Sequence, residues 1–284
     1  FLDLLSRNIK NKFKVSDYLI YVLLATVCDV MPIRKLNRLI ALNALKKFDI
    51  NKNIAINEIF NLSNKKNKLN INDLGYLIGP ILNAGGRLGK SNLASELLSS
   101  DNTEVVTTRS NELIKLNNKR KKIEKLTLNE VNFLKIKNEN SNVIIYYSQS
   151  INEGLIGIIA ARLKEYFYKP VIVITKSGDL LKGSARSTLN YNIGSAIKNS
   201  LDKNIIVSGG GHNMAAGFVL KKDKLKNFKD FILEDFSKKV TLKNNTFYYD
   251  AEISSQALNY DFFLDINKLG PFGPGNPNPT FLFK

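Results

Sequence analysis

Two uninterrupted apolar runs constrain the fold of this chain more than any other feature of its sequence. They lie at 143–147 (VIIYY) and 170–174 (PVIVI), and a segment with helical spacing of apolar residues, 156–167, separates them. Strands that are apolar on both faces are typical of parallel sheets covered by helices, and an intervening helix makes a βαβ unit. The sequence therefore predicts an α/β domain. Its further expected elements are a strand at 181–187, a helix at 193–201, an apolar stretch at 215–220 and an amphipathic helix at 224–240.

The residues before this domain are largely helical in pattern. Apolar runs predict helices at 18–27 and 34–48, and Asp17 is a plausible N-cap of the first. From about 103 to 137 there is neither glycine nor proline, and apolar residues at helical spacing lie among many charges. This pattern predicts one long, partly exposed helix that connects two domains. The chain is accordingly divided into segments 1–102, 103–140, 141–242 and 243–284.

The composition excludes several classes of protein. The chain is 44% hydrophobic and 24% charged, which is globular rather than wholly disordered. No apolar run approaches the roughly 20 residues that span a bilayer, and no secretory signal is visible, so we expect no membrane contact. The one cysteine, Cys28, excludes an intramolecular disulfide and indicates a reducing, cytoplasmic location. The net charge of +17 suits a polyanionic partner such as nucleic acid, although a general bias toward Lys and Asn accounts for it equally well.

Two candidate sites lie in the helical part. Asp29 follows an apolar helix and precedes Pro32, and a carboxylate there can bind Mg²⁺ or Mn²⁺. Alone, such an aspartate is more often an ordinary helix-terminal or turn residue, and one carboxylate cannot hold a catalytic metal. The stretch 83–89 (NAGGRLG) predicts a glycine-rich turn in which backbone N–H groups and Arg87 can approach a phosphate. An ordinary loop is the alternative.

Two further candidate sites lie in the α/β domain. Ser184 and Arg186 are two residues apart on a predicted strand, so both side chains face the same way and can grip one phosphate. A pair of solvated strand residues fits the spacing as well. Residues 208–212 (SGGGH) predict a triple-glycine turn before His212, the only histidine, and such turns usually allow close approach to the main chain. A contact of His212 with a phosphate or a metal-bound oxyanion, and an ordinary packed or solvated histidine, both remain open.

Together, in this order and spacing, these segments resemble the RecJ family of single-stranded-DNA-specific exonucleases in the DHH phosphoesterase superfamily. The similar stretches are 26–32 with Asn37 and Arg38, 74–88, 116–124, 153–163, 182–187, 209–217 and 270–277. The resemblance implies an α/β protein with four parts. They are the C-terminal part of a DHH catalytic domain (1–102), an interdomain connecting helix (103–140), a smaller α/β DHHA1 domain (141–242) and the start of an oligonucleotide-binding (OB) β domain (243–284).

The resemblance also implies an activity: metal-dependent 5′-to-3′ hydrolysis of single-stranded DNA in DNA repair and recombination, with two Mn²⁺ or Mg²⁺ ions. Single-stranded DNA is the implied partner, and whether a single-strand-binding protein or a helicase also binds is left open. The implied catalytic residues are Asp29, which is also the metal ligand, and His212. The implied phosphate-binding residues are Asn83, Arg87, Ser184, Arg186, Ser187, Gly210, Gly211 and His212.

Two departures from the family pattern bear on this interpretation. The Asp-His-His signature and the earlier aspartate-rich motifs are absent from the chain, so we expect them upstream of Phe1 and expect this segment alone to be inactive. Asn152 takes a position where the family usually has histidine. One alternative is a superfamily enzyme acting on oligoribonucleotides or cyclic dinucleotides, which as a rule lacks stretches like 74–88 and 270–279. The other is a non-catalytic single-strand-binding remnant.

Overall fold

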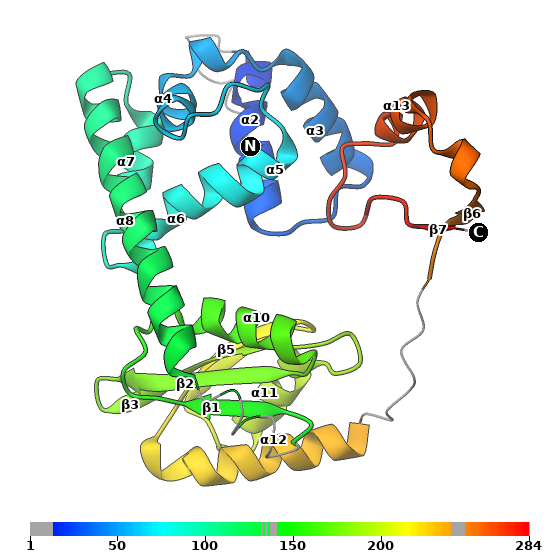
Figure 1. Ribbon diagram of the computed structural model, residues 1–284. Helices are drawn as coiled ribbons and strands as arrows, with labels where there is room; N and C mark the ends of the chain where they lie inside the picture. The colour runs from blue at the N-terminus through cyan, green and yellow to red at the C-terminus, as the bar shows by residue number, and fades with distance from the viewer. Residues whose placement is uncertain (1–13, 132, 134–135, 137–140, 240–247, 284) are drawn as a thin grey trace. The chain divides into compact units, whose positions relative to one another are not determined.

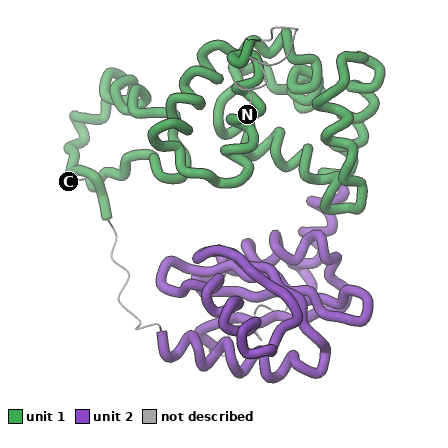
Figure 2. The backbone as a smooth tube through the Cα atoms, turned by 180° about the vertical axis from the view of Figure 1, so that it is seen from behind, with its two compact units in different colours: residues 1–117, 245–284 green, residues 118–244 purple. Residues whose placement is uncertain are grey.

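The computed structural model describes residues 14–131, 133, 136, 141–239 and 248–283. The chain divides into two compact units, residues 1–117 with 245–284 and residues 118–244 (Figures 1 and 2). The domain limits expected near 140 and 242 fall on or next to residues outside the described part, so those limits stay predictions. Within the described ranges, no helix combines the length and apolarity that crossing a membrane requires.

The first unit is built mainly from helices around one apolar core. The helices expected at 18–27 and 34–48 are confirmed as α2 and α3, but Asp17 lies in the first turn of α2 instead of capping it. An N-cap does occur at Asn53, whose Oδ1 accepts the N–H of Ile56 (2.9 Å). The helices are α2 (Val15–Cys28), α3 (Lys35–Lys47), η1 (Ile50–Lys52), α4 (Ile54–Leu62), α5 (Ile71–Asp73), the π-helical turn η2 (Leu74–Ile78), α6 (Gly79–Arg87) and α7 (Leu93–Ser99).

The long helix predicted from residue 103 is α8 (Thr103–Glu130), which runs from the first unit into the second. Its start is capped by Asn102, whose Oδ1 accepts the N–H of Glu104 (2.9 Å). The expected continuation to 137 includes residues outside the described part, and the helix as described ends at Glu130.

A five-stranded mixed sheet forms the centre of the second unit, in the order β1-β2-β3-β5-β4. The predicted βαβ unit is confirmed, because β1 (Ile144–Tyr147) pairs in parallel with β2 (Val171–Ser177) and α10 (Ile156–Phe167) connects them. The other strands are β3 (Leu180–Arg186), β4 (Ser208–His212) and β5 (Ala215–Leu220). The pairs β2 with β3, β3 with β5 and β5 with β4 are all antiparallel. A short helix, η3 (Lys222–Lys224), follows β5. The glycine segment predicted as a turn is therefore an edge strand, β4.

Two apolar clusters cover the two faces of this sheet. Val171 and Val173 of β2 pack with α10 on one face. Ile172 and Ile174 face the other way and pack with residues of α11 (Ile193–Asp202) and α12 (Leu225–Lys239). Fully apolar strands are explained by this double burial. The expected amphipathic helix at 224–240 corresponds to α12, and Val240 lies outside the described residues.

The last described segment belongs to the first unit. It contains β6 (Ala251–Ile253), η4 (Ser255–Ala257), α13 (Tyr260–Lys268) and β7 (Phe281–Phe283). β6 pairs in parallel with β7, which agrees with the start of a β domain expected within 243–284, of which residues 243–247 lie outside the described part. Figure 1 shows the loop after α13 lying beside the start of α3.

Candidate functional site

Asp29 is held at the end of α2 by a complete helix-capping motif. The N–H of Val30 donates to the carbonyl of Val27 (3.1 Å), and the N–H of Met31 donates to that of Thr26 (2.9 Å). These two bonds define a Schellman motif, whose C′ position usually holds glycine. Here Val30 occupies that position with a left-handed φ of 56°, a conformation that strains a β-branched residue. The motif fixes the backbone on both sides of Asp29.

The Asp29 side chain is exposed and presents its carboxylate to solvent. Within the described part of the chain, no group donates a hydrogen bond to it, so both oxygens are available for the hard cations that carboxylates prefer. Burial, and secondarily the charge of Asp29, raise the pKa of the neighbouring Cys28 thiol. Among the described residues, no three His, Cys, Asp or Glu side chains are grouped so as to hold a metal ion. Asp29 therefore fits as one oxygen ligand, and these residues alone do not complete a metal site.

Two glycines bring α6 against the Asp29 turn. A Cβ at Gly79 would lie 2.6 Å from Sγ of Cys28, and one at Gly75 would lie 3.1 Å from the Val27 side chain. The glycines are four residues apart, so η2 and the first turn of α6 contact the end of α2 without intervening side chains. Single π-helical turns such as η2 occur often at functional sites. The packing places the start of α6 next to the candidate ligand.

Asn83 and Arg87 lie along α6 on the same side as Gly79, because positions four apart share a helix face. Each step of four advances about 6 Å along the axis. Asn83 is exposed and Arg87 is half-buried. Between them, a Cβ at Gly86 would meet no atom within 4 Å. Gly86 lies three residues after Asn83 and shares its face of the helix, so a ligand can approach the backbone there beside the Asn83 side chain.

The turn predicted over 83–89 is wrong for residues 83–87, which are helical. The helix persists because tertiary packing overrides the low helix propensity of glycine. A Cβ at Gly85 would lie 2.4 Å from the carbonyl oxygen of Lys90 and 3.3 Å from the side chain of Leu113. The turn begins only at Leu88, and Gly89 takes a left-handed φ of 85°.

Ser184 and Arg186 lie on the same face of β3, as their spacing predicts. Nη1 of Arg186 donates to Oγ of Ser184 (3.2 Å) and to the carbonyl of Ala185 (2.8 Å). A Cβ at Gly157, in the first turn of α10, would lie 3.0 Å from Nη2 of Arg186 and 3.2 Å from Oγ of Ser184. No side chain of the described residues caps that turn. The backbone N–H groups of that turn and the positive end of the helix dipole can therefore bind the same anion as the Ser184 hydroxyl and the Arg186 guanidinium.

The three glycines of β4 lack side chains for different reasons. A Cβ at Gly209 would lie 2.9 Å from Ile197 of α11, and one at Gly211 would lie 2.4 Å from the carbonyl oxygen of Ala215. A Cβ at Gly210 would meet nothing within 4 Å. Packing thus requires the outer two glycines, and it leaves the middle one unexplained.

Strand register joins Gly210 and His212 to the β3 residues. Gly210 pairs with the exposed Gly217 of β5, which pairs with Ser184. His212 pairs with Ala215, which pairs with Arg186, so two strand spacings, about 10 Å, separate the backbones of His212 and Arg186. The structure thereby places Ser184, Arg186, Gly210 and His212 on one face of the sheet, on β3 and β4, which lie on either side of β5. Gly211 pairs with Ala216, which pairs with Ala185, and therefore faces the other way.

Ser187, another predicted site residue, does not reach this surface either. It follows β3 and is fully buried, and its Oγ donates to the carbonyl of Tyr191 (2.7 Å). Asn152 has a local role, because its Oδ1 accepts the N–H of Gly154 (2.9 Å) ahead of α10. Sequence reasoning missed Gly157 and Gly217. The spacing 154–157 within the similar stretch signalled the first, whereas the second depends on strand register.

Two ionic groups border or stabilise this region. Glu153 accepts from Oγ of Ser177 (2.8 Å) and from Nζ of Lys182 (3.4 Å), and these hydrogen bonds lower the pKa of its exposed carboxyl group. Farther along α10, Glu124 of α8 accepts from Nε of Arg162 (3.0 Å) and fastens the two helices together. These contacts therefore join the loop before α10 to β2 and β3, and join α10 to α8.

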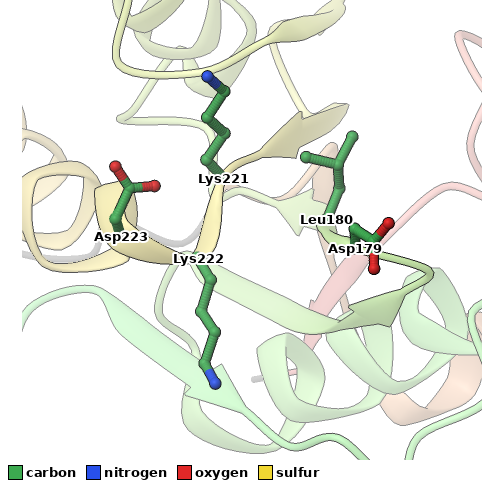
Figure 3. A pocket seen from close by; sticks show the side chains of 5 residues that line it. All are labelled: Asp179, Leu180, Lys221, Lys222 and Asp223. Carbon is green, nitrogen blue, oxygen red and sulfur yellow. The ribbon is translucent and has the colours of Figure 1, made fainter.

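A surface recess in the second unit lies at the other end of β3 from Arg186 (Figure 3). It is lined by Asp179, Leu180, Lys221, Lys222 and Asp223. Its two lysine side chains point in opposite directions, and its charges balance (Figure 3). The recess therefore has no convergent set of donors, and it is separate from the candidate site.

Known proteins share both the domains and the sequence. Residues 140–238 match the DHHA1 domain, and residues 249–284 match the RecJ OB domain. The single-stranded-DNA-specific exonuclease RecJ of Escherichia coli is 32% identical over 283 residues, and that of Salmonella typhimurium is 31% identical over 283 residues. Each match covers 94% of this chain and 48% of the relative. The chain thus spans about half the length of these curated relatives.

Solved structures show the same architecture. The crystal structure of RecJ from Thermus thermophilus in complex with Mn²⁺ matches with a TM-score of 0.83 and 23% identity, over 94% of this chain and 40% of that one. An exonuclease RecJ bound to manganese matches with a TM-score of 0.65 and 23% identity, over 84% of this chain and 58% of that one. At these identities the likeness shows a common fold. Together, the matches show a chain that is similar to RecJ proteins along 94% of its length, with one segment that matches the DHHA1 domain and a following one that matches the RecJ OB domain.

Proposed function

We propose that this protein is a metal-dependent exonuclease that degrades single-stranded DNA from the 5′ end, in DNA repair and recombination in the cytoplasm. The names of its relatives support the reaction. In this proposal residues 1–102 are the C-terminal part of a DHH domain, 103–140 the connecting helix, 141–242 the DHHA1 domain and 243–284 the start of the OB domain.

Two glycines, Gly86 and Gly210, carry the proposal. Each lies beside predicted phosphate-binding side chains, has open space where a Cβ would be, and has no left-handed φ. Glycine inside a helix or strand is less stable than alanine by about 0.5–1 kcal/mol. Neither packing nor backbone conformation explains these two, in contrast to Gly89 and Gly211. A ligand that approaches the main chain closely, such as a sugar-phosphate backbone, does explain them.

The side chains around these glycines fit a phosphate ligand. In the second unit, Arg186 presents a planar fork that matches phosphate oxygens, and Ser184 and the first turn of α10 add neutral donors. We assign the exposed His212 to a contact with the phosphate or a metal-bound oxyanion. In the first unit, Asn83 shares the helix face of Gly86, and Arg87 is the next residue along the helix.

Asp29 contributes one carboxylate to the metal site in this proposal. Bound Mn²⁺ or Mg²⁺ ions supply charge neutralisation at the phosphoryl group and an activated water. Further ligands are needed, because the described residues provide no cluster. The role of the described residues is to hold the Asp29 carboxylate in a fixed position, through the Schellman turn at Val30 and the packing on Gly79.

Alanine substitution at the two open glycines tests the proposal in the full-length protein. Gly86→Ala and Gly210→Ala should keep or raise the free energy of unfolding, by up to about 1 kcal/mol. They should slow Mn²⁺-dependent release of nucleotides from 5′-phosphorylated single strands by about tenfold or more, because the added methyl group occupies the space of the substrate backbone. Thermal unfolding and a nuclease assay measure the two effects.

Gly211→Ala is the matched control, because its Cβ would collide with backbone atoms and it should lose activity together with stability. Full nuclease rates in both Gly86→Ala and Gly210→Ala would show that the open glycines do not face the substrate. Failure of the wild-type protein to degrade single-stranded DNA would reject the function itself.

A further inference from the structure

The loop 269–276 is bonded to the segment that follows the Asp29 turn. The main-chain N–H of Ile33 donates to the carbonyl of Pro274 (2.6 Å). Nη1 of Arg38 donates to the carbonyl of Leu269 (2.6 Å), and Nε of Arg34 donates to that of Gly275. Three donors from six consecutive residues of the helical unit thus bind three carbonyls of a loop more than 230 residues away in the sequence.

Close packing accompanies these hydrogen bonds. Ile33 is 1% exposed, and a Cβ at Gly273 would lie 2.9 Å from its Cγ1. A Cβ at Gly275 would lie 3.0 Å from Cβ of Pro32, and Gly275 has a left-handed φ of 75°. Glycine is therefore required where the loop closes on the segment.

The loop is also braced internally. Nδ2 of Asn276 donates to the carbonyls of Leu269 (3.1 Å) and Pro271 (3.0 Å). Gly273 and Asn276 exchange two backbone hydrogen bonds of 2.9 Å each. A loop with this many internal bonds holds its shape and can hold what it contacts.

The backbone between this contact and Asp29, the candidate metal ligand, has little conformational freedom. Between Asp29 and Ile33, Val30 is held in the Schellman turn and Met31 donates its N–H to Thr26. Pro32 has a ring-fixed φ, and its carbonyl accepts from Nδ2 of Asn37 (3.0 Å). A displacement of Ile33 is therefore passed on to the backbone of Asp29.

We propose that the loop 269–276 is a clasp that positions Asp29, and that Arg34 and Arg38 are its positioning residues. The inference rests on the proposed function, because it assigns the clasp a role in orienting the metal-binding carboxylate. Arg34 is exposed and Arg38 is partly exposed, and a single hydrogen bond makes only a modest net contribution to overall stability, so we assign these bonds to local geometry. The OB segment thus influences the catalytic domain through the main chain of one turn.

The test compares Arg38→Ala with Arg38→Lys in the full-length protein by hydrogen exchange and kinetics. Loss of the clasp should make the amides of Met31 and Ile33 exchange at least about tenfold faster under native conditions, because their segment opens locally. The kcat for single-stranded DNA should fall about tenfold or more with KM changed less than about twofold, because orientation rather than binding is lost. Arg38→Lys keeps a charged donor and should recover most of both effects.

Lys47→Ala is the matched control, because it removes one exposed positive charge from the same helix without touching the loop. It should leave exchange and kcat unchanged. Unchanged amide exchange in Arg38→Ala would overturn the clasp. Faster exchange with a wild-type kcat would reduce the loop to a structural contact, and a raised KM with an unchanged kcat would make Arg38 a DNA ligand; either result overturns the positioning role. If the wild-type protein does not cleave DNA, the proposed function fails and the positioning role falls with it, while exchange still reports whether the clasp exists.

Discussion

The two units expose their candidate site residues on different kinds of backbone. In the first unit, Asn83 and Arg87 follow a spacing of four along α6, and Asp29 lies on a turn packed against that helix. In the second unit, Ser184 and Gly210 lie on separate strands that are joined through Gly217 of β5. The first arrangement is set by local helix geometry and one close packing contact. The second depends on strand pairing over a long stretch of sequence.

The two sites also differ in charge. The first contains a carboxylate, which repels a phosphate unless a cation lies between them, and therefore suits metal binding and catalysis. The second consists of donors, namely a guanidinium, a hydroxyl and the first turn of α10, and suits phosphate binding. Substitution of the Asp29 carboxylate should therefore slow the chemical step itself, whereas substitution of a donor in the second unit should lower the nuclease rate by weakening the contact with the substrate phosphate.

The largest expected effect is that of Asp29→Ala in the full-length protein. Removal of a metal ligand should lower the Mn²⁺-dependent nuclease rate by more than about 10³-fold, because several kcal/mol of charge stabilisation depend on the metal site. Affinity for single-stranded DNA at one fixed salt concentration should stay within a few-fold, because phosphate contacts dominate affinity. Nuclease assays and binding titrations provide the two measurements.

Asp17→Ala is the control, since it removes an exposed carboxylate from the same helix α2. Surviving activity in Asp29→Ala would make Asp29 an ordinary turn residue. Loss of activity, binding and folded structure together would make it a structural cap.

A smaller effect is expected for Arg186→Lys. Lysine keeps the charge but not the planar fork, so a bidentate phosphate contact would be lost. The rate on 5′-phosphorylated single strands should fall by about tenfold, the scale of one charge-assisted hydrogen bond. Arg162→Lys, an equivalent change in an ion pair with Glu124, should leave the rate unaltered. A wild-type rate in Arg186→Lys would show that Arg186 is only a surface charge.

The sequence predicts the βαβ unit and the common face of Ser184 and Arg186 because both follow from periodicity within one segment. The same alternation places Ser187 on the opposite face, so its burial could have been predicted from its position next to Arg186. The pairing of Gly210 with Gly217 could not, because it depends on how non-consecutive strands assemble.

At two glycine-rich places the sequence predicts a turn where the backbone is regular: a helix at 83–87 and a strand at 208–212. Residues 83–87 are helical because Gly85 packs against Leu113 of α8, and residues 208–212 form a strand because Gly209 packs against Ile197 of α11. Both contacts are tertiary, and neither leaves a periodic signal in the sequence. The clasp between Ile33 and the loop 269–276 was missed for the same reason, since it joins distant segments through main-chain atoms.

The smallest expected effect compares left-handed residues of the two units. Val30 and Asn204 both have a φ of 56°, but a β-branched residue pays about 1–2 kcal/mol in that conformation, whereas asparagine tolerates it. Val30→Gly should therefore raise the free energy of unfolding by about 0.5–1 kcal/mol, after the greater flexibility of glycine in the unfolded chain is subtracted. Asn204→Gly should change it by only a few tenths of a kcal/mol, because asparagine already adopts this conformation with little strain. Denaturant titrations of both variants measure the difference, and an equal or reversed order would mean that the Schellman turn beside Asp29 is not strained.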